Sequence, residues 1–155
     1  SVQIAGSILR RLKFDNKSID KITRLIKHHD REIVPRPRPV AKAVNAVGED
    51  IFLDLLDVKR ADKSAQISSD VQKGLEYMDL IEKIYNDMKM EKYCFELKDL
   101  AINGEDLIRM GFKEGKEIGR TLDILLDKVM ENPSLNDKKL LIGIASGRLK
   151  EQKNI

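Results

Sequence analysis

The chain has 155 residues, of which 41% are hydrophobic and 35% charged, a composition typical of a water-soluble helical protein. It contains no apolar run near the roughly 18 residues that a membrane span needs, and no signal peptide opens it. A single cysteine excludes a disulfide framework and favours a reducing, cytoplasmic location. Aromatic residues make up 5%, and alternating β-branched residues are nearly absent, so we expect an all-α fold.

The net charge of +3 is unevenly distributed along the chain. Residues 1–42 carry eleven Lys or Arg against four Asp or Glu, whereas the remaining residues carry eighteen against twenty-two. A basic first part suggests an anionic partner such as nucleic acid. The alternative is that these charges form an ordinary solvated surface.

Helical spacing of apolar residues begins at the start of the sequence. The positions concerned are Val2, Ile4, Ala5, Ile8, Leu9 and Leu12. No N-cap precedes them, so we expect either a chain cut inside a domain or an expression scar at Ser1-Val2. Phe14-Asp15-Asn16 predicts a break that caps a second helix, which runs to about His28-His29-Asp30.

The segment Pro35-Arg-Pro-Arg-Pro39 predicts a stiff, basic, extended connector, because its prolines stand at alternate positions. A short helix follows and ends at Gly48. The next helix carries Ile51, Phe52, Leu55, Leu56 and Val58 towards Asp62. Small polar residues over 64–70 indicate a boundary, after which Ser69 or Asp70 caps a long helix that reaches about Met90.

The segment from Phe95 to Leu126 predicts a helical hairpin with a turn at Gly111–Gly115. Gly111 suits the left-handed position that ends the first helix, and Gly115 opens the second. Gly119 has no side chain to hold a neighbouring helix away. Free N–H groups and two lysines near this turn could hold a phosphate. The alternative is a packed hairpin whose glycines serve geometry alone.

Asn132-Pro133 predicts the end of the hairpin's second helix, and a last helix starts at Leu135-Asn136. Cys94 has Lys92 nearby but no histidine, which indicates a buried structural thiol rather than a nucleophile. The sequence has no phosphate-binding loop, no serine nucleophile motif and no paired catalytic carboxylates.

The only two histidines, in His28-His29-Asp30, are the first place to look for metal ligands. Adjacent helical residues point about 100° apart, so the two would not normally share an ion. One histidine, Asp30 and the distant Asp62 could form a site instead. The alternative for the histidines is favourable electrostatics at a helix C-terminus, and Asp62 could equally face solvent or cap a neighbour.

The hairpin and the helix after it resemble a known family. A signature is formed by Leu100, Ile102, Gly104, Asp106, Leu107, Gly111, Gly115, Ile118, Gly119 and Leu122, with Asn136 leading the last helix. This pattern over about forty residues is similar to the C-terminal domain of bacterial CCA-adding enzymes, the tRNA nucleotidyltransferases. A related poly(A) polymerase would look similar here.

The front half resembles the end of an HD-type segment in the same family, over Ile8–Asp30 and Val47–Gln66. The resemblance implies a truncated HD-like helical segment (1–67), a long connecting helix (68–92) and a small helical tail domain (93–155). Asp62 matches the final HD aspartate but lacks its partners. His29-Asp30 stands too close to Asp62 for the family pattern, so we expect no metal ligands here.

The catalytic head of that family, which transfers nucleotides from CTP and ATP with magnesium, has no counterpart in this sequence. The glycine-serine signature and the Asp-x-Asp pair are missing, because Asp54–Asp57 and Asp123–Asp127 have the wrong spacing. We therefore expect a C-terminal fragment without catalysis of its own.

The resemblance implies tRNA as the partner, since the body and tail of these enzymes hold the tRNA while the head works at its 3′ end. Recognition of a folded RNA by shape and phosphate requires cations and backbone donors. We expect these at the turn, in Lys113, Gly115, Lys116 and Arg120, and more weakly in Arg36, Arg38 and Lys42 of the basic front.

Two other classes of function stay open at this stage. One is a fragment of an HD-type metal-dependent phosphohydrolase. The other is a structural module that forms a homodimer through the long helix from Asp70 to Met90.

Overall fold

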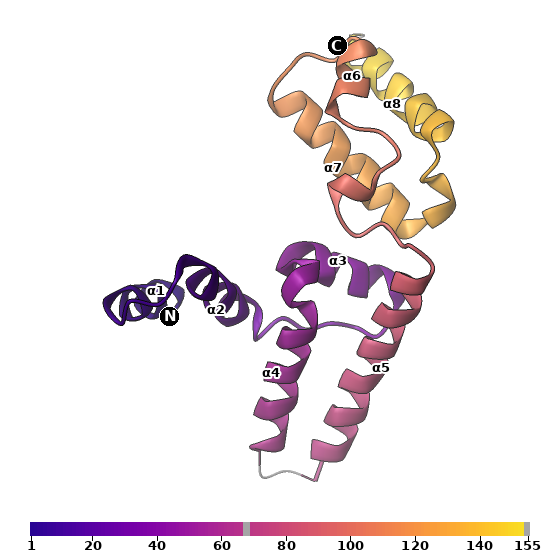
Figure 1. The fold of residues 1–155 in the computed structure, drawn as a ribbon. Coiled ribbons are helices and arrows are strands. Elements are labelled where there is room, and N and C mark those ends of the chain that lie inside the picture. Colours follow the sequence, from indigo (N-terminus) through magenta and orange to yellow (C-terminus); the bar gives the residue numbers. More distant parts are fainter. Residues whose placement is uncertain (67–68, 154–155) are drawn as a thin grey trace. The chain divides into compact units, whose positions relative to one another are not determined.

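The structure, a computed structural model, describes residues 1–66 and 69–153, and the side chains as far as residue 150. All regular elements in this part are helical (Figure 1), which confirms the all-α prediction. None of its helices has the length and apolar character that crossing a membrane requires. The chain forms two compact units, Ser1–Lys89 and Met90–Ile155. The boundary expected between residues 67 and 68 lies outside the described residues, and the three-part division stays a prediction.

The first unit begins with two short helices whose connection was predicted. Its elements are α1 (Val2–Arg11), α2 (Asn16–His28), α3 (Pro37–Val47), the 3₁₀ turn η1 (Glu49–Ile51), α4 (Phe52–Ser64) and α5 (Val71–Met90). Asp15 caps α2, because its carboxylate accepts a hydrogen bond of 3.0 Å from the Ser18 N–H. Gly48 ends α3 with φ at 101°, as expected.

The prediction of an extended connector over Pro35–Pro39 is wrong for its second half. α3 begins at Pro37, with Arg36 as its N-cap. Prolines fit the first turn of a helix, because the N–H groups they lack have no partner there in any case. The first helical hydrogen bond is donated by the Val40 N–H, the first N–H after these prolines, to the Arg36 carbonyl at 3.0 Å.

The core of the first unit lies where α3, α4 and α5 meet. It contains Val40, Ala41, Ala43, Val44, Val47, Ile51, Phe52, Leu55, Leu56, Ile81, Tyr85 and Met88. The rings of Phe52 and Tyr85 pack with their centroids 5.0 Å apart. Arg60 joins α4 to α5 through ion pairs to Asp79, at 2.9 Å, and to Glu82. These contacts hold α4 and α5 alongside each other (Figure 1).

The second unit is organised around its longest buried helix, α7. Its elements are η2 (Leu97–Asp99), α6 (Gly104–Arg109), α7 (Lys116–Glu131), η3 (Pro133–Leu135) and α8 (Lys138–Lys153). α7 contacts η2, α6, η3 and α8. Its inner face buries Leu125, Leu126 and Val129, as the apolar spacing predicted, together with Thr121 and Met130.

The turn between α6 and α7 has the geometry predicted for its glycines. Gly111 and Gly115 have φ values of 99° and 106°, where side chains other than hydrogen are strained. The N–H groups of Gly111 and Phe112 donate to the carbonyls of Ile108 and Leu107, at 2.9 and 3.1 Å. This pair of bonds is the Schellman motif, and buried Phe112 supplies its usual apolar contact.

Close approach of a neighbouring helix was expected at Gly119, but it occurs at another glycine. A Cβ at Gly119 would meet nothing within 4 Å, so no neighbour approaches it closely. A Cβ at Gly104 would lie 3.3 Å from Cγ2 of Ile118, so Gly104 is the residue that lets α6 approach α7. The sequence pattern could not separate the two, because both stand at signature positions.

We expect Gly111→Ala to lower the free energy of unfolding by about 1–2 kcal/mol, since alanine is strained at positive φ. The matched control is Gly119→Ala, which lies exposed within α7 and should raise stability by about 0.5–1 kcal/mol. Urea unfolding of the whole chain measures both. Equal changes in stability for the two substitutions would contradict the conclusion that Gly111, and not Gly119, requires positive φ.

The last helix starts later than predicted, and Asn136 does not cap it. α8 begins at Lys138, and the Asp137 carboxylate accepts from the N–H groups of Lys139 and Leu140, at 2.9 and 3.1 Å. The Asn136 amide holds a distant loop instead. Its oxygen accepts from the Ala101 N–H at 2.8 Å, and its nitrogen donates to the Asp99 carbonyl at 2.9 Å.

Substitution Asn136→Ala should therefore destabilise the chain by about 1–2 kcal/mol, because it leaves both backbone groups without this partner. Lys139→Ala is the control, since its exposed side chain should change stability by less than about 0.5 kcal/mol. Thermal or urea unfolding is the measurement. If Asn136→Ala lowers the free energy of unfolding no more than the control does, then other contacts hold the loop.

Candidate functional site

The turn between α6 and α7 presents three of the predicted site residues at the surface. Lys113 lies in the turn, Lys116 is the first residue of α7, and Arg120 follows one helical turn later on the same side. All three are exposed, and within the described part of the chain none of their side chains has an ion-pair or hydrogen-bond partner. Gly115, the N-cap of α7, stands between them. The structure thus brings together the first group of predicted residues.

Two of the backbone donors near this turn already have partners. The Lys113 N–H donates to the Glu117 carboxylate at 3.3 Å, and the Ile118 N–H donates to the Gly115 carbonyl at 3.2 Å. A carboxylate in the first turn of α7 also interacts favourably with the helix dipole. These two N–H groups are therefore not available to an anion, whereas the cationic side chains are.

The second group of predicted residues lies on α3 in the other unit. Arg36 is the exposed N-cap of α3, and Arg38 and Lys42 are one helical turn apart on a common face. Arg38 and Lys42 already interact with other groups of the chain. This group is consequently less free to receive an anion than the cations at the turn.

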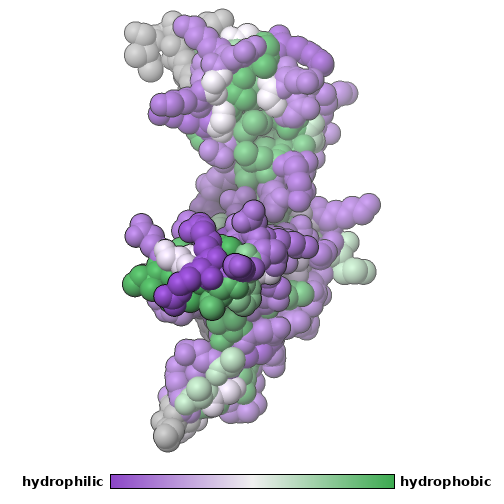
Figure 2. Space-filling view, turned by 60° about the vertical axis from the view of Figure 1, so that its left-hand side comes forward, coloured by the Kyte–Doolittle hydropathy of each residue, from purple (hydrophilic) through white to green (hydrophobic). Residues whose placement is uncertain are grey.

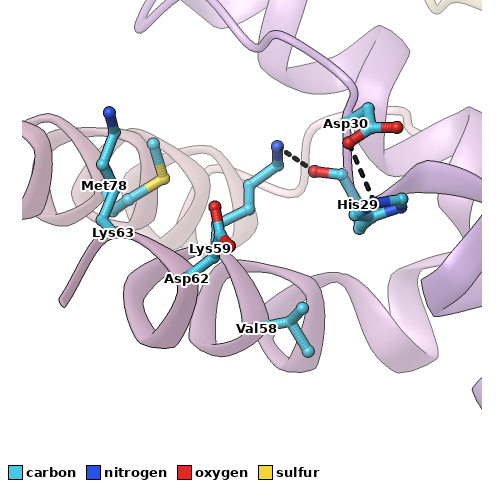
Figure 3. Close-up of a pocket in the computed structure, with 7 residues that line it drawn as sticks. All are labelled: His29, Asp30, Val58, Lys59, Asp62, Lys63 and Met78. Atoms are coloured by element: carbon cyan, nitrogen blue, oxygen red, sulfur yellow. Dashed lines mark hydrogen bonds and ion pairs between the residues drawn. The ribbon is translucent and has the colours of Figure 1, made fainter. Parts of the chain in front are cut away.

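A polar pocket of about 190 Å³ lies in the first unit, where α4 and α5 meet the end of α2 (Figure 3). Its lining includes His29, Asp30 and Asp62, the three residues considered as metal ligands. His28 does not line it, as the geometry of adjacent helical residues predicted. The His29 ring pairs with the Asp30 carboxylate at 2.9 Å.

Lys59 gives this pocket a different chemistry from that of a metal centre. Its ammonium donates to the His29 carbonyl at 2.6 Å (Figure 3), which ties α4 to the end of α2. Partial burial lowers the pKa of Lys59, while Asp30 and Asp62 act in the opposite direction. No sequence pattern indicated this lysine, because it stands among other charged residues on α4.

Asp54 and Asp57 do not form a magnesium site of the kind implied for the catalytic head, because each pairs with a different cation. Asp54 pairs with Lys21 at 2.9 Å, and Asp57 pairs with Arg60 at 3.1 Å. Over residues 1–66 and 69–150, no three His, Cys, Asp or Glu side chains gather as ligands.

The cysteine lies in the core of the second unit, as predicted. Cys94 is buried, and burial raises the pKa of its thiol to about 12. A thiol with so high a pKa is neutral at physiological pH and is a poor nucleophile.

Several residues of the sequence signature have structural roles that the structure explains. The Asp106 carboxylate accepts from the Asn103 N–H at 3.1 Å and from Lys138 at 2.9 Å. These bonds lower the pKa of Asp106. They also join the start of α6 to the start of α8, so the signature describes how the second unit is held together.

One of three comparisons with known proteins identifies a family. Comparison with curated proteins and comparison with solved structures each gave no match. Residues 2–145 match the family described as tRNA nucleotidyltransferase domain 2. This match covers both units, including the turn at Gly111–Gly115 and the polar pocket. The chain therefore belongs to the tRNA nucleotidyltransferase domain 2 family.

Proposed function

We propose that this chain is the tRNA-binding, C-terminal part of a CCA-adding tRNA nucleotidyltransferase and that it performs no catalysis by itself. Its family membership supports tRNA as the partner. The observation that carries the proposal is a group of three exposed cations at the turn between α6 and α7, which have no side-chain partner among the described residues: Lys113, Lys116 and Arg120.

The chemistry of RNA backbones fits this turn. Phosphate contacts are made by Lys and Arg side chains, and recognition of folded RNA depends on shape more than on base edges. The two positive-φ glycines permit this turn, and the hydrogen bonds from the Gly111 and Phe112 N–H groups to α6 hold its start in place. Glu114 and Glu117 lie beside the cations and reduce the local positive charge. We therefore propose a contribution to tRNA affinity rather than a complete binding site.

The nucleotide transfer itself is assigned to a head outside this sequence. The magnesium ion and the CTP and ATP would be bound there, because the motifs for them are missing from these residues. A cytoplasmic location accords with the lone cysteine. Formation of a homodimer through α5 stays a prediction.

An HD-type phosphohydrolase is the less favoured proposal. Asp62 lies in a pocket with His29 and Asp30, but the Lys59 ammonium occupies the same lining. A divalent cation would have to displace or neutralise this lysine.

We expect double substitution of Lys113 and Lys116 by Glu to weaken tRNA binding by about tenfold or more at moderate salt. Filter binding of the whole chain to unmodified tRNA, at about 50–200 mM salt, measures the affinity. The slope of log affinity against log salt should become shallower by roughly 1.5, because two phosphate contacts are lost.

The matched control reverses two exposed lysines of α5, Lys73 and Lys83, and changes the net charge equally. Equal loss in both double variants would mean that net charge, not the turn, determines binding. Absence of binding by the unsubstituted chain at low salt would contradict the proposal for this chain.

A further inference from the structure

The first unit exposes apolar side chains on two of its sides. One set lies on α1, at the start of the sequence, and Figure 2 shows its hydrophobic surface on the side that comes forward. The other set lies on α5, on the far side of α4 from α1 and α2 (Figure 1). Because α4 lies between them, the exposure of the α5 set does not depend on contacts with the residues that begin the sequence.

The outer face of α5 combines apolar and charged side chains. Tyr77 and Leu80 are 37 and 46% exposed, and half-buried Ile84 follows Leu80 by one helical turn. Helical spacing places these residues in one stripe with four charged residues, on the side opposite the core. The charged residues are Lys73, Glu76, Lys83 and Asp87. These seven residues are called the α5 face below.

The charges of the α5 face are arranged about Leu80 in pairs of opposite sign. Lys73 and Asp87 stand seven residues before and seven after it. Glu76 and Lys83 stand four before and three after it. Fourteen residues of helix span about 21 Å, so Lys73 and Asp87 of one chain cannot pair with each other. The same arrangement is complementary to itself when the helix is reversed.

A twofold axis through Leu80, perpendicular to α5, would bring two copies of this face together as antiparallel helices. Leu80 would then pack on the same residue of the second copy, since a twofold interface pairs identical surfaces. Lys73 would lie opposite Asp87 of the second copy, and each such contact occurs twice. On one flank Glu76 would meet Lys83 of the second copy, and the other flank would pair the two remaining apolar residues of the α5 face.

The four charges are available for such pairing. In the part of the chain that the structure describes, Lys83 and Asp87 have no ion-pair partner. Lys73 pairs with Asp70 at 3.6 Å, and Glu76 accepts a hydrogen bond of 3.1 Å from the amide one turn before it. Both contacts join exposed side chains, and such contacts contribute little to stability.

Other occupants fit the α5 face less well. A membrane surface would have to bury the carboxylates of Glu76 and Asp87 beside anionic headgroups. A strongly acidic or strongly basic partner would be repelled by half of the charges. Another segment of the same protein has a sequence of its own, which has no reason to match charges arranged symmetrically about Leu80. A second copy matches them because its charges are the same ones in reverse order.

We propose that the α5 face joins two copies of this chain through an antiparallel pair of α5 helices, with the twofold axis at Leu80. This specifies the face, the direction and the residue pairs of the homodimer expected at α5 from the sequence. It does not depend on tRNA binding, because the turn between α6 and α7 lies in the second unit. A single helix face is smaller than a standard interface, so the expected dissociation constant is about 1–100 µM.

Sedimentation equilibrium of the whole chain, over about 5–500 µM, measures this association. Leu80→Glu should raise the dissociation constant about tenfold or more, because it places two like charges at the axis. Leu12→Glu is the matched control, since Leu12 is 60% exposed on α1 and should leave the dissociation constant unchanged. Both substitutions are at exposed positions, and circular dichroism establishes that each variant keeps its helices.

Reversal of single charges tests the residue pairs. Glu76→Lys and Lys83→Glu should each raise the dissociation constant about fivefold or more, because each places like charges opposite each other twice. An effect of net charge alone would move the two variants in opposite directions. A mixture of the two variants should associate about as tightly as the unsubstituted chain, since every flank then pairs a lysine with a glutamate.

Cysteine substitution tests the direction of the helices. Under mild oxidation, Lys73→Cys mixed with Asp87→Cys should form a disulfide-linked dimer, whereas Lys73→Cys alone should form at least about fivefold less. The native Cys94 is buried and does not compete. Non-reducing electrophoresis measures the linked fraction. A parallel pair of helices would instead link Lys73→Cys to itself.

Four results would each overturn the proposal. The first is a monomer at all concentrations up to about 500 µM. The second is a dimer that Leu80→Glu weakens no more than Leu12→Glu does. The third is a mixture of Glu76→Lys and Lys83→Glu that associates no better than either variant alone. The fourth is linkage of Lys73→Cys alone as readily as in the mixture with Asp87→Cys.

Discussion

The backbone conformation of Gly111 and Gly115 is the constraint on which the second unit depends. Positive φ at these two residues stops α6 after six residues and starts α7 in a new direction. The reversal buries Phe112 beside Leu107 and sends the polar residues between the glycines outward. α7 can then bury one face against α6 and α8 while Lys116 and Arg120 stay at the surface. The same local geometry therefore determines both the packing of this unit and the position of its cations.

The distribution of ion pairs distinguishes cations that stabilise the fold from cations that are available to a partner. Lys21, Arg24, Arg60 and Lys138 each pair with a carboxylate of another element, and these pairs join helices within a unit. Lys113, Lys116 and Arg120 have no such partner in the described part of the chain. A lysine or arginine that pairs with a carboxylate of the same chain contributes less free energy to phosphate binding, because it must first lose its existing partner. Arg38 and Lys42 also have partners, and this difference is why the turn is preferred to the second group of predicted residues.

Features set by short-range physics were predictable from the sequence, and those set by distant contacts were not. The cap at Asp15, the ends of α3 and α7, and the turn glycines depend on a few neighbouring residues. The start of α3 was missed because prolines are compatible with both an extended segment and a first helical turn. Asn136 and Asp137 are both good capping residues, and the choice between them is made by the loop at 99–101, far away in sequence. Lys59 acquires its role only when α4 packs near the end of α2.

The polar pocket brings together the three residues that were considered as metal ligands from the sequence. The fold places Asp62 near a histidine and a second carboxylate, His29 and Asp30. Yet the pocket also holds the Lys59 ammonium, whose positive charge is partly compensated by Asp30 and Asp62. The half-buried ammonium and a divalent cation would compete for the same two carboxylates, and the lysine is part of the chain and always present. In this chain Asp30 and Asp62 both favour the charged form of the lysine that joins α4 to the end of α2.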